Sequence, residues 1–234
     1  PIAKSPSPTP TPDATANWKT YRNEEYGFEV KYPSALNLDK NATFWIDPVT
    51  NEGNLFRIIF QKSYQNPDRH YNYLTINVKN KPADFVDLET YVEEIVKKIN
   101  KAGEGAAAGY GVAHVDKINI DNKESFRIQA QSGSVSRHTD VWVYTEQLNY
   151  IYTLEYNYSA YELELVESGE AAKFAESTDE QTRQRFEENK LSHDFAPKMI
   201  STFQFLHPKI LQPEIPYIKV ISPNGGEKWI AGNT

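Results

Sequence analysis

Cysteine is absent from this chain of 234 residues. Its absence excludes disulfide bridges, thiolate nucleophiles and Cys-based zinc or iron–sulfur sites. Long hydrophobic runs are also absent, since no stretch approaches the roughly 20 apolar residues of a membrane-spanning helix. The 25 Lys and Arg residues are outnumbered by 32 Asp and Glu, and the net charge is -7. This acidic balance argues against nucleic acid as a partner.

Sequence signatures of catalysis are scarce. There is no Gly-x-Ser-x-Gly elbow, and the glycines at 103–111 lack the lysine of a phosphate loop. Ser136, His138 and Asp140 are close in sequence, but closeness along a chain does not make a catalytic triad. His193 has only Asp194 beside it as a metal ligand, and the oxygen-rich segment 47–54 lacks EF-hand spacing. We therefore predict no enzyme activity, no cofactor and no metal.

Proline is concentrated at the two ends of the chain. Residues 1–16 (PIAKSPSPTPTPDATA) alternate proline with serine and threonine, which predicts an extended, semi-rigid tether. Residues 208–217 contain three more prolines and are expected to form a second linker. One domain is therefore expected at 17–207. The proline-rich start predicts an extracellular or cell-envelope protein that is tethered through an anchor outside this chain.

Hydrophobic periodicity predicts the elements of that domain. Leu88, Val92, Ile95 and Ile99 recur at helical spacing after a possible cap at Asp87. An acidic helix is expected at 167–190, lying on the surface because it has few apolar residues. A separate short helix should follow from Phe195. Strands are predicted at 28–32, 44–46, 55–61, 74–78, 115–120, 125–130, 139–145 and 150–158. This order predicts an α+β fold, an antiparallel β-sheet flanked by helices.

Two segments of the domain resemble PsbP-like domains. Residues 18–34 (WKTYRNEEYGFEVKYPS) are similar to the opening strand of that family, and residues 199–205 (MISTFQF) to its final segment. The resemblance implies a layered sandwich of antiparallel sheet and helices and implies little about activity. The acidic helical stretch at 167–194 looks like an insert in that fold.

A second resemblance lies after the proline-rich linker. Residues 218–229 (IKVISPNGGEKW) are similar to the first strand of Ig-like modules of bacterial surface proteins. We therefore expect 218–234 to be the truncated first strand of a following module. A single strand of this kind cannot fold alone.

Aromatic residues offer the most interesting candidate site. Tyr150, Tyr152, Tyr156 and Tyr158 share one face of a predicted strand, because side chains alternate between faces. A tyrosine ring with a polar tip suits contact with a glycan or protein. The same face could instead pack beneath a helix, and the more polar opposite face supports that alternative. An aromatic loop at 70–73, with Tyr71 and Tyr73, is a second candidate.

The sequence thus leaves three functions open. The first is a non-catalytic extracellular or cell-surface module, acting as a binding or spacer domain in a larger anchored protein. The second is a glycan- or small-ligand-binding domain that uses an aromatic face. The third is an envelope hydrolase. The expected partners are an envelope glycan or a surface protein.

Overall fold

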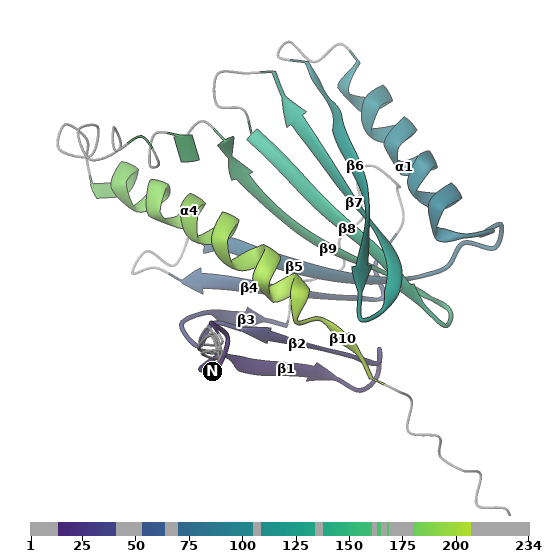
Figure 1. Ribbon diagram of the computed structural model, residues 1–234, viewed down its shortest axis with the longest axis horizontal. Helices are drawn as coiled ribbons and strands as arrows, with labels where there is room; N and C mark the ends of the chain where they lie inside the picture. The colour runs from purple at the N-terminus through teal and green to yellow at the C-terminus, as the bar shows by residue number, and fades with distance from the viewer. Residues whose placement is uncertain are drawn as a thin grey trace, which may run out of the picture.

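The structure, a computed structural model, describes residues 14–40, 53–63, 70–104, 109–133, 138–160, 163–164, 168 and 180–206. Within these residues the chain forms two antiparallel sheets and two long helices (Figure 1). None of the described helices is long and apolar enough to cross a membrane. Most of the predicted tether, the predicted strand at 44–46, the second linker and the Ig-like segment lie outside the described residues.

The larger sheet has seven strands in the order β3-β4-β5-β9-β8-β7-β6. Its neighbouring strands are all antiparallel, so two meanders, β3 to β5 and β6 to β9, meet where β5 pairs with β9. The strands are β3 (Asn37–Asp39), β4 (Phe56–Ser63), β5 (His70–Asn80), β6 (Tyr110–Ile120), β7 (Lys123–Ser132), β8 (His138–Gln147) and β9 (Tyr150–Ser159).

The smaller sheet joins the two ends of the domain. It contains β1 (Lys19–Asn23), β2 (Phe28–Tyr32) and β10 (Gln204–Phe205), with β2 in the centre. The two segments that resemble PsbP-like domains therefore pair with each other, and Phe205 lies opposite Phe28. The rings of Phe28 and Phe203 stack with centroids 5.3 Å apart. This stacking explains why aromatic residues occur in both segments.

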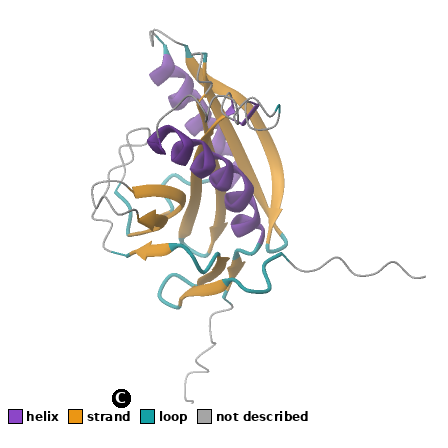
Figure 2. Cartoon of the chain, turned by 90° about the vertical axis from the view of Figure 1, so that its left-hand side faces the viewer, coloured by secondary structure: helices purple, strands orange, loops and turns teal. Residues whose placement is uncertain are grey.

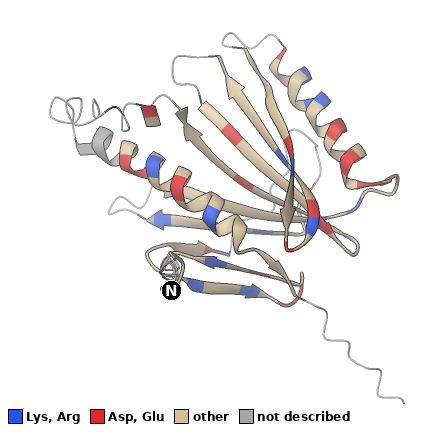
Figure 3. Cartoon of the chain, in the orientation of Figure 1, with Lys and Arg blue, Asp and Glu red and all other residues tan. Residues whose placement is uncertain are grey.

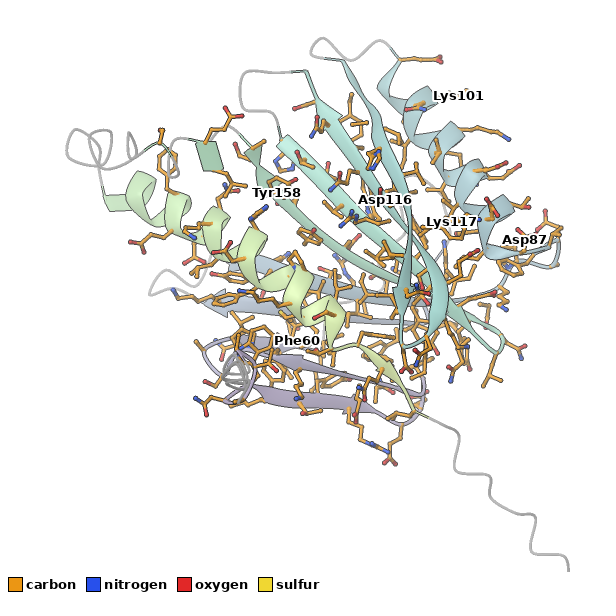
Figure 4. The ribbon with its side chains drawn as sticks, viewed as in Figure 1. Phe60, Asp87, Lys101, Asp116, Lys117 and Tyr158 are labelled. Atoms are coloured by element: carbon orange, nitrogen blue, oxygen red, sulfur yellow. The ribbon has the colours of Figure 1, made fainter. Side chains whose placement is uncertain are left out.

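Helix α1 (Leu88–Gly103) forms as the periodicity predicts. The side chain of Asp87 accepts a hydrogen bond from the backbone N–H of Thr90 at 2.7 Å, which satisfies one of the free donors at the helix start. Lys101 lies in the last turn, where a cation interacts favourably with the helix dipole. Figure 4 labels Asp87 and Lys101 at the two ends of α1. The buried face contains Leu88, Val92, Ile95 and Ile99.

The two faces of the larger sheet have separate hydrophobic cores. On one face, α1 packs on Phe126, Ile128 and Tyr144. On the other face, α4 (Glu180–Ser201) and the smaller sheet pack on residues such as Val143 and Leu154. Figure 2 shows the two helices against a body made of strands. The predicted α+β fold, an antiparallel sheet flanked by helices, is confirmed.

The structure corrects the prediction for the C-terminal helices. Residues 180–201 form one helix, α4, with Pro197 inside it, and no short helix begins at Phe195. The part of α4 that was expected on the surface, within the 167–194 insert, buries Phe186, Glu188 and Asn189. Polar side chains occupy buried positions here because β4 and β9 supply hydrogen-bond partners for them. A count of apolar residues alone therefore underestimated how much of this helix is buried.

Candidate functional site

The tyrosine strand is part of the core. β9 carries Tyr152, 1% exposed, and Tyr156, 8% exposed, on the face that packs against α4 and the smaller sheet. Tyr150 and Tyr158 are partly buried against the same core. The Tyr152 hydroxyl donates a hydrogen bond to the carbonyl of Tyr26 at 2.6 Å, and burial raises its pKa. The face packs beneath a helix, as one of the two alternatives predicted.

The segment expected to be an aromatic loop is a strand. Residues 70–73 begin β5, because their backbone pairs with the end of β4. Tyr73 is fully buried in the core beneath α4. Tyr71 lies opposite Lys62 in the register, and its side chain is outside the described part of the structure. Tyr73 is therefore unavailable for ligand contact in this state.

A hollow of about 210 Å³ lies beside the first half of α1. We call it the α1 hollow. Its apolar surface comes from Phe85, Tyr91 and Ile95, with polar groups around them. An apolar, partly aromatic surface with a few polar groups is typical of sites that bind small ligands. The residues that line it are Pro82, Asp84, Phe85, Val86, Thr90, Tyr91, Glu94, Ile95 and Lys98.

The loop before α1 gives the hollow its shape. The N–H of Lys81 donates to the carbonyl of Asn149, so the loop starts at the β8–β9 turn. Pro82 then begins a tight turn that the N–H of Phe85 closes on the Pro82 carbonyl at 3.1 Å. The rings of Phe85 and Tyr91 have centroids 6.1 Å apart. The turn thus places one ring from the loop beside one ring from the helix.

Two lysines lie against the aromatic rings of the hollow. Lys79, 5% exposed, places its Nζ 5.0 Å from the ring centre of Tyr91, and Lys81 places its Nζ 4.7 Å from that of Phe85. An ammonium group over an aromatic ring is attracted by the negative face of the ring. Tyr91 also packs against Tyr144 of β8. These contacts fix both rings in place.

The charge around the hollow is mixed. Asp84 and Glu94 line it and have no ion-pair partner among the described residues. Lys98 lies one helical turn after Glu94 on the same side of α1. The backbone N–H of Thr90 holds the pKa of the neighbouring Asp87 below its usual value. Figure 3 shows acidic residues along α1 and the loop before it. The exposed carboxylates are available as hydrogen-bond acceptors for a ligand.

The histidines that the sequence singled out lie elsewhere. His138 approaches Asp140 on β8 with 3.2 Å between Nε2 and Oδ1, and Asp140 also accepts a hydrogen bond from Tyr110 at 2.7 Å. Ser136 is outside the described residues. His193 lies beside Asp194 on α4. In the described ranges no group of three or more His, Asp or Glu residues could hold a metal ion.

The α1 hollow was not anticipated from the sequence. A signal for it exists, because Tyr91, Glu94 and Lys98 share one side of the helix at spacings of three and four. The contribution of Phe85 depends on the turn at Pro82, which only the structure reveals.

Comparisons with known proteins give structural matches only. No family model and no curated protein matches the chain. The solution structure of PsbP (CyanoP) from Synechocystis sp. PCC 6803 aligns with a TM-score of 0.47 and 12% sequence identity, over 85% of this chain and 98% of that chain.

Two further solved structures are similar. A protein of unknown function from Pseudomonas aeruginosa aligns with a TM-score of 0.34 and 15% identity, over 70% of this chain and 96% of that one. A protein from Bacteroides thetaiotaomicron aligns with a TM-score of 0.36 and 12% identity, over 82% of this chain and 49% of that one. These likenesses concern the fold alone.

Proposed function

We propose that this chain is a non-catalytic extracellular or cell-surface module. It acts as a binding or spacer domain in a larger anchored protein. The proline-rich residues 1–16 and the Ig-like residues 218–229 support this setting, since such segments are typical of modular surface proteins. The ligand we propose is an envelope glycan or a surface protein that contacts the α1 hollow.

The chemistry of the α1 hollow carries this proposal. The rings of Phe85 and Tyr91 offer apolar surface to the C–H face of a sugar or to an apolar side chain. Asp84 and Glu94 can accept hydrogen bonds from hydroxyl groups, and Lys98 can donate them. Such a combination orients a small polyhydroxylated ligand. The aromatic contact proposed from the sequence thus moves from the buried tyrosines of β9 to α1.

A thermal-shift screen of the full chain tests the binding role. The panel contains envelope glycans, peptidoglycan fragments and polysaccharide-derived oligosaccharides. A ligand that binds the native state raises the melting temperature in a saturable way. A flat response across the glycan panel would contradict glycan binding and favour a spacer. Turnover of any panel member would contradict a non-catalytic role.

Two matched variants then locate the site. Tyr91→Ala should weaken binding by about tenfold, because truncating an aromatic anchor commonly costs 1 kcal/mol or more. Tyr158→Ala removes a tyrosine from β9, beneath α4, and should leave the affinity unchanged. If Tyr158→Ala weakens binding and Tyr91→Ala does not, the ligand binds on β9 and the α1 hollow is excluded.

A further inference from the structure

In the first part of α4, residues 180–194, the described side chains hold the helix through hydrogen bonds to the end of β9, together with the buried Phe186 and the partly buried Leu191. The side-chain oxygen of Asn189 accepts from the N–H of Ser159 at 2.6 Å, and its amide donates to the Ser159 carbonyl at 3.0 Å. The hydroxyl of Ser192 donates to the carbonyl of Asn157 at 3.0 Å. By contrast, the last part of α4 is held by buried apolar side chains, including Met199 and Ile200.

A buried carboxyl group lies in the same part of the helix. The side chain of Glu188 is 2% exposed, and its Oε1 accepts a hydrogen bond from Nζ of Lys62 at 3.2 Å. Its Oε2 is buried without a hydrogen-bond partner among the described groups. Lys62 is itself 40% exposed on β4, so solvent weakens this ion pair. Burying a charge with one lone partner costs free energy.

A proline separates the two parts of α4. Pro197 has no backbone N–H, so the carbonyl of His193 lacks its usual partner within the helix. The hydrogen-bond ladder within the helix is therefore interrupted between its first and last parts. Local opening of residues 180–194 would leave Ala196, Met199 and Ile200 in the core.

We propose that residues 180–194 form a releasable cover over β9, hinged at Pro197, and that loss of a proton from Glu188 opens it. Opening exposes Tyr156 and Tyr158, which lie beneath this part of the helix. Tyr158 packs against His193 with ring centroids 5.0 Å apart and lies between β9 and α4 in Figure 4. The cover would thus control access to an aromatic surface that is separate from the α1 hollow.

The direction of the pH response follows from the buried carboxyl. Burial raises the pKa of Glu188 above its usual value, against the opposing effect of Lys62. The closed state therefore binds the proton more tightly than the open state, and closure weakens as the pH rises through the pKa of the closed state. The titratable groups around this part of the helix are Lys62 on β4, Tyr156 and Tyr158 on β9, and Lys190, His193 and Asp194 on α4.

Two of these neighbours, Tyr156 and Asp194, keep the same charge near neutral pH. Burial raises the pKa of Tyr156 to about 12, so its hydroxyl stays neutral there. Burial acts to raise the pKa of Asp194, but its hydrogen bonds and charge interactions with Lys190 and His193 outweigh this and lower the pKa, so this carboxyl stays ionised. His193 contacts both Asp194 and Tyr158. The test therefore includes a variant at this histidine.

The absence of native cysteine allows a single thiol to report opening. Ser192→Cys places a thiol at a side chain that is buried in the closed state. With 4,4′-dithiodipyridine at about pH 8, this thiol should react several-fold more slowly when Glu188→Gln is added, because the amide is neutral at every pH. The difference should shrink as the pH is lowered and Glu188 becomes protonated. The difference in thiol reactivity at about pH 8 should remain when His193→Gln is added to both variants.

Two controls make the result decisive. A thiol introduced by Met199→Cys lies in the apolar last part of α4 and should react far more slowly than the one at 192. Hydrogen exchange of residues 180–194 in the cysteine-free chain, with and without Glu188→Gln, provides the same comparison without a thiol. Equal opening with Glu and Gln at position 188 would overturn the proposal. Equal reactivity at positions 192 and 199 would also overturn it, because the whole chain would then be opening.

Discussion

Glycine at position 103 is required by a close approach of two backbones. Gly103 is the last residue of α1, and a Cβ atom there would overlap the carbonyl group of Tyr110 at the start of β6. The glycine therefore does more than end the helix. It allows α1 to pack against the edge strand that follows it in sequence.

Gly103→Ala is expected to lower the free energy of unfolding by about 1–3 kcal/mol, the range typical of overpacking in a core. The helix end or β6 must move to make room for the methyl group. Chemical denaturation of the full chain measures the change. Ala102→Ser, at the exposed neighbouring position, should change it by less than about 0.5 kcal/mol. Equal stability of Gly103→Ala and the unmodified chain would show that the backbones can separate freely.

For the buried polar residues, the sequence predicted the face of the strand but not the hydrogen-bond partners. The alternation in β9 correctly placed Tyr152 and Tyr156 on one face. It could not show that the Tyr152 hydroxyl meets the carbonyl of Tyr26, since that residue is distant in sequence. The same holds for Asn189 and Ser159. The alternation of side chains along a strand predicts which residues share a face. The hydrogen-bond partner of a polar side chain depends instead on the fold.

Asp87 gives a prediction about the element that it starts. Its carboxylate accepts from the N–H of Thr90, and this hydrogen bond lowers its pKa. The ionised cap therefore stabilises the fold at neutral pH, and the contribution is lost as the pH falls through the lowered pKa. Asp87→Ala should lower the melting temperature at about pH 7, with the difference from the unmodified chain shrinking at about pH 3.

Asp87→Asn is the matched control for the cap. Asparagine is also a good N-cap residue and keeps a side-chain acceptor at every pH. Its melting temperature should exceed that of Asp87→Ala at both pH values. A constant difference between Asp87→Ala and the unmodified chain from neutral to acid pH would contradict a role for the ionised carboxylate.

The two helices differ in how far the sequence predicts them. α1 is stabilised by local signals, namely a cap and four apolar residues at helical spacing, and its prediction is confirmed. The buried side of α4 includes Glu188, Asn189 and Ser192, whose polarity suggested an exposed helix. Their hydrogen-bond partners lie on β4 and β9, so no local sequence pattern predicts that these residues are buried. The sequence analysis missed the α1 hollow for a similar reason. Hydrophobic periodicity does not predict the turn that places Phe85 beside the helix.

At the scale of the molecule, one core connects both sheets and α4. Phe28 of the smaller sheet is fully buried and packs against Phe56 of β4, Tyr152 of β9 and Phe203. Among the described residues the smaller sheet has three strands, and one of them, β10, has two residues. So small a sheet depends on this shared core for its stability. The two sheets should therefore unfold as one unit.

Phe28→Ala tests this dependence. The substitution should lower the free energy of unfolding by about 3–5 kcal/mol, because it leaves a cavity in a core that both sheets share. Trp18 packs on Phe195 beside the smaller sheet, whereas Trp142 lies on the α1 side of the larger sheet. Variants that keep one of these tryptophans and replace the others with phenylalanine report each region by fluorescence. In both the Phe28 and Phe28→Ala backgrounds, the two probes should show the same denaturation midpoint. An earlier midpoint for Trp18 would mean that the smaller sheet separates first and that the shared core does not couple the two sheets.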